Sequence, residues 1–236
     1  DGSFQCCVSF QNADIHQLHK REHVFPTYTI LLPETYDEYF NQLTPKMRKS
    51  SRYEKNRLAK NDSHRYLHYT GSEAVAAWPT FLSIEDSGWK GAKASSILKL
   101  AENYRAYYDG LVDLLHRNKK LHIYFLEIDG QVVAGMFGYV DHDVFHACKS
   151  GYVETFSMYS PSNQLALYLI EDVIRNFPTV KRINLFPWGH GYKHRYINEN
   201  LHCTDLSLFN STIRGRVVYS AVSIKERIKS IPGLAK

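Results

Sequence analysis

The segment FSMYSPSNQLALYLIEDVIRNF, Phe156 to Phe177, places a short polar turn between a strand-like start and an apolar helix. Pro161 suits the first position of a helix, where the backbone N–H groups have no partners inside the helix. These donors and the partial positive charge of a helix start favour a bound anion, so we predict an anion site at this turn. The alternative is that Ser160 only caps the helix through its side chain, because capping needs the same geometry.

A second segment that could take part in binding is KMRKSSRYEKNRLAKNDSHR, which is rich in Lys and Arg. Thr44 as a cap and Pro45 in the first turn predict a helix there, with Met47, Tyr53 and Leu58 as its few apolar residues. A solvated helix face is one interpretation. The other is a surface for an anionic partner, namely a phosphate, a nucleic acid or an acidic acceptor. We favour nucleic acid less, because no strand platform of interleaved aromatic residues is evident.

The cysteines and histidines give weaker signals. Four cysteines include an adjacent pair and lack CxxC spacing, which indicates neither a disulfide framework nor a zinc site. The two histidines of HGYKH lack the H-E-x-x-H pattern, so we predict no metal. Cys148 shares a predicted strand face with His146 and is a candidate nucleophile, but no third group is present to orient the histidine. The cysteine usage fits a reducing cytoplasm.

The composition is that of an ordinary globular chain of 236 residues, with 44% hydrophobic and 22% charged residues and a formal net charge of +5. The chain holds no apolar run of about 18 residues, so we predict no membrane span. Its start, DGSFQCCVSF, lacks the build of a signal peptide, and a cytoplasmic location is expected. The first residue is not Met and the first thirty residues are irregular, so we expect a processed or truncated chain. Oligomeric state is not indicated.

Hydrophobic periodicity predicts the elements that position these residues. Asp129-Gly130 is a strong hairpin turn, and a weaker turn at 140–143 completes an antiparallel meander. A break at Pro79 is expected in the helix that contains it. The predicted elements are a helix at 45–65, a strand at 64–71, a helix at 72–91, a long helix from Ser95 to Asn118, three meander strands within 121–153, the helix after Pro161, strands at 180–186 and 202–209, and a basic C-terminal helix.

This order of elements, with five short motifs, resembles the GNAT acyltransferases from about Tyr28 to Phe209. Within them the chain resembles cellulose-biosynthesis-type (BioF2-like) acetyltransferases and Fem-type peptidoglycan bridge transferases. The motifs are YTILLPETYDEYFNQLTPKMRKSSRYEKNRLAK, SGWKG, LEIDGQVVAGMFGYV, YSPSNQLALYLIEDVI and INLFPWGHGYKHRY. The resemblance implies a mixed α/β fold with a central, largely antiparallel sheet flanked by helices. It also implies three segments: an N-terminal extension or the remnant of a preceding domain at 1–27, the acyltransferase domain at 28–210 and a basic helix at 211–236.

The resemblance further implies an N-acyltransferase that uses acyl-CoA, most simply acetyl-CoA, as a substrate and needs no metal. Family members bind the CoA pyrophosphate with backbone N–H groups at the turn before the helix. The matching groups here belong to Ser160, Ser162, Asn163, Gln164 and Leu165, with Pro161 fixing the turn. The acceptor would be an amine of a small molecule or a cell-envelope precursor, and transfer would be direct, without a covalent intermediate.

Such a transfer needs a deprotonated amine and a proton for the leaving thiolate. Glu154 is the first candidate for the base and His146 the second, with an exposed loop carboxylate and a packing histidine as the alternatives. Tyr192 or Tyr159, or water, would protonate the thiolate. For the acceptor, the resemblance points to Lys193, with Arg195 beside it, and to the Trp89-Lys90 pair; core packing of Trp89 and coverage of Trp188 by the Lys193 stem are the alternatives.

Three positions depart from the subgroup pattern: Ser162 replaces a glycine, Asn184 an acidic residue and Val153 an aspartate. These departures support an alternative in which the chain is a catalytically silent GNAT-like binding domain. A second alternative is a Fem-type transferase that uses aminoacyl-tRNA, which the basic helix would suit but which we favour less. RNA-dependent activity that falls steeply with salt would identify it.

Overall fold

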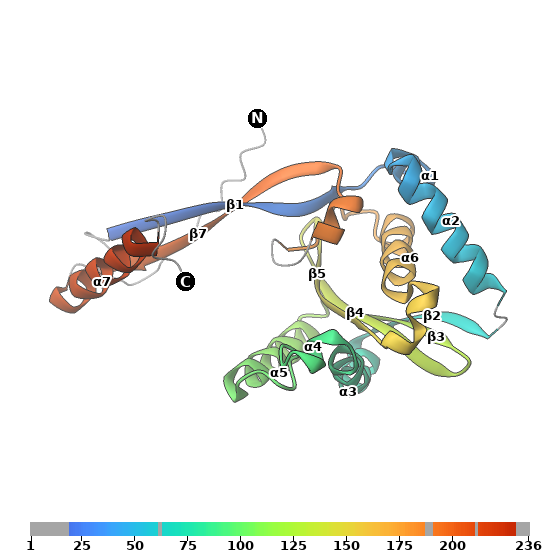
Figure 1. Cartoon of the computed structure of the whole chain (residues 1–236), viewed down its shortest axis with the longest axis horizontal. Helices are drawn as coiled ribbons and strands as arrows, with labels where there is room; N and C mark the ends of the chain where they lie inside the picture. The colour runs from blue at the N-terminus through green and yellow to red at the C-terminus, as the bar shows by residue number, and fades with distance from the viewer. Residues whose placement is uncertain (1–18, 61–62, 187–190, 211, 230–236) are drawn as a thin grey trace. The chain divides into compact units, whose positions relative to one another are not determined.

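The computed structural model describes residues 19–60, 63–186, 191–210 and 212–229. These ranges contain seven strands, seven α-helices and two 3-10 helices, the last written η (Figure 1). In chain order they are β1 (His19–Leu31), α1 (Tyr36–Gln42), α2 (Pro45–Ala59), β2 (His64–Thr70), α3 (Gly71–Ser87), α4 (Trp89–Ala92), α5 (Glu102–Arg117), β3 (Leu121–Ile128), β4 (Gln131–Asp141), β5 (Val144–Tyr152), η1 (Glu154–Tyr159), α6 (Pro161–Asn176), β6 (Arg182–Asn184), η2 (Gly191–Arg195), β7 (Glu199–Phe209) and α7 (Ile213–Lys229).

The strands form one sheet in the order β2-β3-β4-β5-β6-β1-β7. β2 to β5 are joined by antiparallel ladders, and β6 pairs antiparallel with β1. β5 and β6 run parallel, because α6 carries the chain from one to the other. The predicted mixed α/β fold with a largely antiparallel sheet is confirmed.

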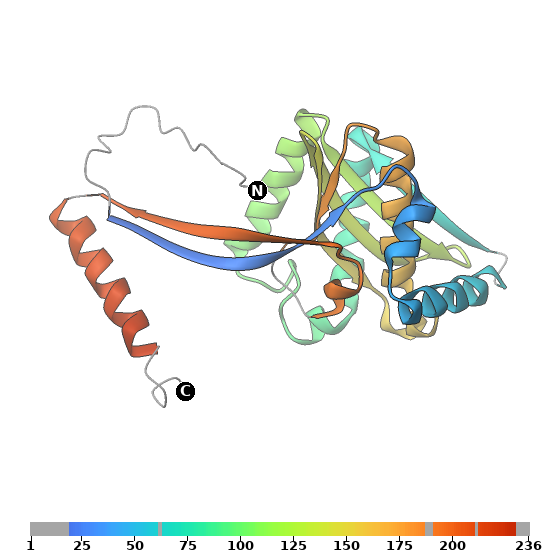
Figure 2. The ribbon, with the colours of Figure 1, turned by 90° about the horizontal axis from the view of Figure 1, so that it is seen from above.

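The chain divides into two compact units. One contains residues 1–25 and 202–236, and the other contains residues 26–201. β1 and β7 lie side by side and both run through the boundary between the units (Figures 1 and 2). The boundaries predicted at residues 27 and 210 remain a prediction.

In the unit of residues 26–201, helices cover both faces of the sheet. α6 packs on one face and is itself flanked by α1 and α2, whereas α3 and α5 pack on the other face (Figure 1). Each face has its own core of buried side chains. Tyr124 and Phe145 belong to the α6 side, and Phe81, Phe125 and Phe137 belong to the α3 side. All eight residues of β3 are buried, as expected for a central strand covered on both faces.

Both predicted turns of the meander are present. Asp129 and Gly130 have φ angles of 51° and 75°, the left-handed conformation that a two-residue hairpin turn requires. His142 has a φ of 51° in the second turn. The two turns set the registers of β3 on β4 and of β4 on β5.

The basic helix α2 begins as predicted. The Thr44 side chain accepts a hydrogen bond from the Met47 N–H at 3.2 Å, and Pro45 opens the helix. Met47 and Leu58 are buried, but Tyr53 is 66% exposed and does not belong to the apolar face.

Two helix predictions were wrong. α3 continues through Pro79, whose ring lies on the exposed side of the helix, so no break occurs there. The long helix expected from Ser95 begins only at Glu102. Residues of the preceding segment are instead held by α3: the Ile97 N–H donates to Glu85 Oε2 at 2.8 Å, and Ser96 Oγ donates to Asp86. Tertiary hydrogen bonds therefore override helical periodicity in this segment.

Three strand predictions were also wrong. Residues 19–31, expected to be irregular, form β1, since an edge partner supplies hydrogen bonds that the local pattern does not reveal. The strand-like start at Phe156 lies in η1. β6 spans three residues, Arg182–Asn184, rather than the seven expected at 180–186, because the backbone turns away after Asn184.

Candidate active site

The central feature of the site is a gap between β5 and β6. On one side β5 pairs with β4 as far as Tyr152. On the other side it pairs with β6 only from Val144 to His146. Beyond His146, the edge of β5 that faces β6 is therefore released from strand pairing in the described part of the sheet.

Asn184 explains why β6 ends at this point. Its side-chain oxygen accepts a hydrogen bond from the Phe186 N–H at 2.8 Å and one from Thr27 Oγ1 at 3.3 Å. Phe186 has a φ of 59°, a conformation that turns the chain away from β5. The amide at this position thus fixes the turn that opens the gap.

A cavity of about 950 Å³ occupies the gap. Its walls come from the released edge of β5, the start of α6, the chain after β6, and the α3–α5 side of the sheet. Residues of both cores line it, for example Ala147 and Ile170 from the α6 side and Tyr108 and Tyr139 from the other. The cavity is therefore lined by side chains from both faces of the sheet.

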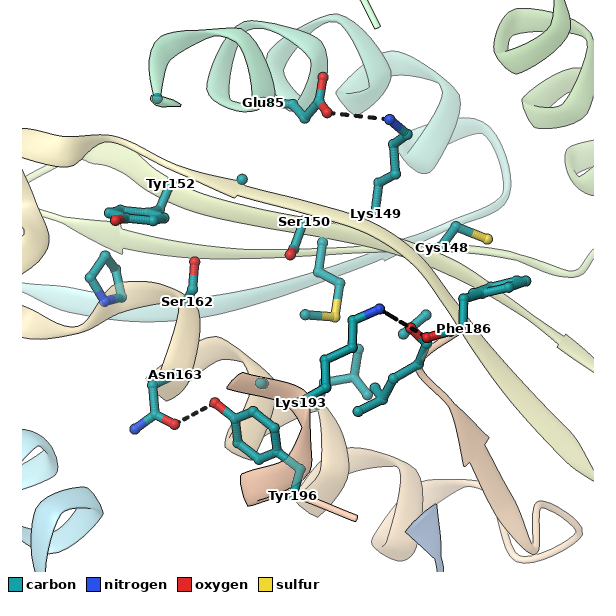
Figure 3. Close-up of a pocket in the computed structure, with 18 of the residues that line it drawn as sticks. Glu85, Cys148, Lys149, Ser150, Tyr152, Ser162, Asn163, Phe186, Lys193 and Tyr196 are labelled. Carbon is teal, nitrogen blue, oxygen red and sulfur yellow. Dashed lines mark hydrogen bonds and ion pairs between the residues drawn. The ribbon is translucent and has the colours of Figure 1, made fainter. Parts of the chain in front are cut away.

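Lys193 reaches the gap from η2 (Figure 3). Its ammonium donates to the carbonyl oxygens of Leu185 and Phe186, at 3.0 Å for Phe186, and lies 5.7 Å from the ring centre of Tyr28. Burial, followed by the positive charge of Lys90, lowers the pKa of Lys193 to about 8. A lysine whose pKa lies this close to neutral pH is a candidate for a chemical role.

Lys90 reaches the same gap from α4. Its ammonium donates to the Ser150 carbonyl oxygen of β5 at 2.7 Å and lies 3.3 Å from Glu85 Oε1. Burial lowers the pKa of Lys90, and the Glu85 carboxylate partly opposes that shift. Lys149 of β5 places a second ammonium 3.5 Å from the same carboxylate oxygen (Figure 3).

Glu85 reaches the cavity because the backbone of α3 packs closely against β5. A Cβ built on Gly151 would lie 2.6 Å from the Glu85 Cα, so only glycine lets α3 approach β5 this closely. The Glu85 side chain is fully buried, and its Oε2 accepts the Ile97 N–H.

The start of α6 forms another part of the cavity wall. Ser160 has a left-handed φ of 51°, and its side chain makes no capping hydrogen bond. The backbone N–H groups of Asn163 and Gln164 donate to the Ser160 carbonyl at 2.9 and 3.1 Å, so both are engaged within the turn. Ser160 and Ser162 are half-buried and line the cavity. Of the six residues predicted to bind CoA, Ser160 to Asn163 line the cavity, whereas Gln164 and Leu165 are buried beneath it.

Asn163 joins three elements through its side chain. Its amide nitrogen donates to Glu54 of α2, and its amide oxygen accepts from the Tyr196 hydroxyl (Figure 3). The Tyr196 carbonyl in turn accepts from the Tyr39 hydroxyl at 3.1 Å. This network fixes the start of α6 relative to the segment that carries Lys193.

The two predicted bases, Glu154 and His146, lie outside the lining of the cavity. Glu154 is an exposed residue at the start of η1. The His146 ring stacks on Tyr139, and burial lowers its pKa. Neither residue is part of the lining, so their roles as bases remain predictions. The side chains of Tyr192 and Trp89 lie outside the described part of the structure, whereas Arg195 is exposed and lines the cavity.

Cys148 lines the cavity, but its thiol is a poor nucleophile. Burial raises its pKa to about 12, so the reactive thiolate is scarce near neutral pH. Its Sγ contacts the His146 carbonyl oxygen at 3.7 Å rather than an imidazole nitrogen. Cys148, the cysteine whose side chain the structure describes, is therefore not activated for a covalent route.

Sequence reasoning missed Glu85, Lys149 and Tyr196. Glu85 precedes the SGWKG motif by two residues, and this closeness to a quoted motif was the available signal. Lys149 follows Cys148 in a strand whose local bulge brings both to the cavity. Tyr196 is one of 17 tyrosines, and nothing in its spacing distinguishes it.

The described residues form neither a metal-binding cluster nor a membrane-spanning helix. No group of three or more His, Cys, Asp and Glu side chains is arranged there to hold a metal ion. None of the described helices is both long and apolar enough to cross a bilayer.

A family model described as an acetyltransferase (GNAT) domain matches residues 45–194, more than half of the chain. No curated protein sequence matches the chain significantly.

Solved structures show the same fold at low sequence identity. A conserved protein of unknown function from Bacteroides thetaiotaomicron is 15% identical with a TM-score of 0.56, and the match covers 83% of this chain and 63% of that one. FemX is 10% identical with a TM-score of 0.57, over 84% of this chain and 63% of FemX. The C-terminal domain of a candidate lysylphosphatidylglycerol synthetase from Agrobacterium fabrum is 10% identical with a TM-score of 0.54, over 87% and 66%. The match thus covers only 63–66% of the length of these neighbours.

Proposed function

This chain belongs to the family of GNAT acetyltransferase domains, and from that membership we propose that it transfers an acyl group from acyl-CoA, most simply acetyl-CoA, to an amine. The observation that carries the proposal is the cavity in the gap between β5 and β6, which joins the start of α6 to two lysine ammonium groups. An acyl thioester with a phosphate-bearing tail suits this cavity, because its phosphates can contact the start of α6 and its thioester can contact the two ammonium groups.

The start of α6 is the proposed pyrophosphate end. The helix contributes a partial positive charge, and Ser162 offers a hydroxyl and a backbone N–H at a half-buried position. Because the Asn163 side chain is engaged by Glu54 and Tyr196, the contribution of Asn163 is to hold the helix start in place.

The released edge of β5 is the proposed contact for the extended arm of CoA. The arm contains two amides, and a strand edge without a neighbouring strand presents backbone donors and acceptors at the spacing that such amides need. The edge lines the cavity from Ala147 to Tyr152. This arrangement would lead the thioester from the start of α6 into the gap.

Lys90 and Lys193 are proposed to stabilise charge on the thioester. The amine nitrogen attacks the carbonyl carbon, the carbonyl oxygen gains negative charge, and the carbon–sulfur bond then breaks. The nitrogen gives its proton to water or to a base, and the departing thiolate accepts a proton. Ammonium groups fixed beside the gap favour the charged oxygen, and they do so more strongly in a water-poor site.

Ligand binding and thiol release together test this function. CoA and acetyl-CoA should raise the melting temperature of the protein, because a ligand that binds only the folded state stabilises it. Free thiol should appear when acetyl-CoA and a panel of primary amines are present, and not with either alone. An unchanged melting curve at millimolar CoA would contradict the proposal, whereas binding without turnover would favour a silent binding domain.

An aminoacyl-tRNA substrate is the second candidate, since α2 borders the cavity. Glu54 of α2 lines the cavity and the Arg57 guanidinium lies 5.9 Å from the Tyr159 ring centre. Lys46, Lys49, Arg52 and Lys55 of the same helix are exposed. This candidate predicts binding of tRNA whose affinity falls steeply as salt rises, and transfer from aminoacyl-tRNA in place of acetyl-CoA.

A further inference from the structure

The part of the cavity on the α3–α5 side differs chemically from the part beside α6. Tyr108, Leu111 and Tyr139 form an apolar and aromatic wall, and Lys149 and Glu85 supply one charge of each sign. The Lys149 ammonium lies 5.0 Å from the ring centre of Tyr108 and is 19% exposed as a side chain. Burial raises the pKa values of Tyr108 and Tyr139 to about 12, so both phenols are neutral near pH 7.

Glu85 carries an oxygen with unused hydrogen-bonding capacity. Its Oε2 accepts the Ile97 N–H, but its Oε1, although buried, has no hydrogen-bond partner among the described residues. The Lys90 and Lys149 ammonium groups lie at ion-pair distances of 3.3 and 3.5 Å from this oxygen. A buried carboxylate oxygen is costly unless donors complete its shell, so a further N–H donor from a ligand would be favoured here.

This oxygen is also close to the gap between β5 and β6. The Lys90 ammonium that lies 3.3 Å from Oε1 donates to the Ser150 carbonyl on β5. Lys90 therefore contacts both Glu85 and the edge of the gap. An amine held at Glu85 would lie next to the ammonium group that is proposed to stabilise the thioester.

Resting on the proposed acyl transfer, we propose that the acceptor is an amino acid, or a molecule that ends in one, with an apolar side chain. Its amine lies at Glu85 Oε1, its carboxylate at the Lys149 ammonium, and its side chain against the wall formed by Tyr108 and Leu111. The opposite charges of the ligand would then face the opposite charges of the protein. An amine without a carboxylate would leave Lys149 without this partner.

Matched acceptors test the proposal with acetyl-CoA as the donor. The panel is phenylalanine, leucine and methionine, each compared with its amide, which keeps the size and the amine but removes the negative charge. We expect kcat/KM for each amino acid to exceed that of its amide by about 10-fold to 100-fold. Equal values for acid and amide in all three pairs would overturn the proposal.

Lys149→Met tests whether Lys149 causes the preference for the amino acid over its amide, because methionine keeps an unbranched apolar stem while removing the charge. In this variant the preference for acid over amide should fall to about 3-fold or less, through loss of kcat/KM for the acids. Lys181→Met, at an exposed lysine outside the cavity lining, is the matched control and should keep the parent's preference. A full preference in Lys149→Met would overturn the assignment.

Calorimetric titration in the absence of acetyl-CoA separates failure of this proposal from failure of the proposed function. Binding of an amino acid that is weakened about 10-fold in Lys149→Met would support the acceptor class even if acetyl-CoA is not the donor. Glu85→Gln keeps the acceptor for Ile97 and should weaken binding of the amine-bearing ligands but not of 3-phenylpropanoate. If no amino acid on the panel binds or reacts, the proposal is wrong, whatever the result with CoA.

Discussion

Lys90 and Lys193 donate hydrogen bonds to backbone carbonyls on opposite sides of the gap between β5 and β6. Lys90 bonds to Ser150 at 2.7 Å and Lys193 to Phe186 at 3.0 Å. Two like charges near one another are unfavourable, and the Lys90 charge helps to lower the pKa of Lys193. The arrangement becomes favourable when an anion lies between them, which is the charge that acyl transfer develops on the thioester oxygen.

Removing the Lys193 charge should reduce catalysis more than stability. Lys193→Met keeps the apolar stem, and we expect kcat/KM to fall about 10-fold to 100-fold with little change in CoA binding. Steady-state kinetics and calorimetric titration of CoA measure the two effects, with Lys181→Met as the matched control. Full activity in Lys193→Met, with a lower melting temperature in Lys193→Ala, would establish a packing role instead.

The parts of the site that the sequence could predict are those governed by local chemistry. Pro161 predicts a helix start, and Asp129-Gly130 predicts the hairpin turn, because each residue restricts its own backbone. Lys90 and Lys193 were predicted through resemblance, and the structure brings both to the gap. Their roles in binding stay predictions.

The parts that could not be predicted depend on contacts distant in the chain. Glu85 reaches the cavity only because Gly151, 66 positions later, leaves room for α3. The helix expected from Ser95 is shortened because Ile97 bonds to that same carboxylate. Glu154 looked suitable because it follows a strand, but the side chain's exposure depends on how η1 packs.

A negative charge at the start of α6 should prevent CoA binding. Ser162→Glu places a carboxylate at the proposed pyrophosphate position, so like-charge repulsion should abolish the rise in melting temperature with CoA. Ser83→Glu, at an exposed position of α3, introduces the same charge away from the cavity and should retain the rise. Substitution of Asn163 or Gln164 would be less informative, because both are buried. A parent-sized shift in Ser162→Glu would remove the helix start from the CoA site.

The Tyr196 hydroxyl should stabilise the protein through Asn163. Tyr196 is 4% exposed, and Tyr196→Phe leaves the buried Asn163 oxygen without that donor. We expect the free energy of unfolding to fall by about 1–3 kcal/mol in urea denaturation. Tyr53→Phe, at a side chain that is 66% exposed, removes a hydroxyl of the same kind and should change the stability little. Equal stability of parent and Tyr196→Phe would show that water replaces the lost donor.

A histidine pair, with His122 buried and His68 half-buried, should make folding stability depend on pH. His68 Nε2 and His122 Nδ1 lie 3.0 Å apart, and His68 Nδ1 lies 3.5 Å from Asp172. Burial, then the neighbouring His68, lowers the pKa of His122 to about 4 from its usual 6.5, and burial lowers the pKa of His68, opposed by Asp172. Between pH 4 and pH 6.5 the unfolded chain therefore binds more protons at these histidines than the folded protein does.

The contribution of this histidine pair to the free energy of unfolding is therefore complete above pH 6.5 and is lost as the pH falls toward 4. A shift of that size at His122 corresponds to roughly 3 kcal/mol. Urea denaturation at a series of pH values should show the decline, and His122→Phe should make the slope shallower by removing one of the two groups. A slope unchanged by His122→Phe would exclude this histidine as a source of the pH dependence.

Lys90 should set the alkaline limit of activity through its charge on Lys193. If the Lys193 ammonium stabilises the developing oxyanion, kcat/KM for an acceptor whose amine pKa lies below 8 should fall as the pH rises through about 8, where Lys193 loses its proton. Burial, the larger cause, remains in Lys90→Met, but the repulsion between the two ammonium groups is removed. The pKa of Lys193 should therefore rise, and the descending limb of the pH profile should move to higher pH. The ascending limb, which reports deprotonation of the acceptor amine, should stay in place for the same acceptor. Lys181→Met should keep both limbs of the parent. A descending limb at the same pH in the parent and in Lys90→Met would show that activity does not depend on the charge of Lys193.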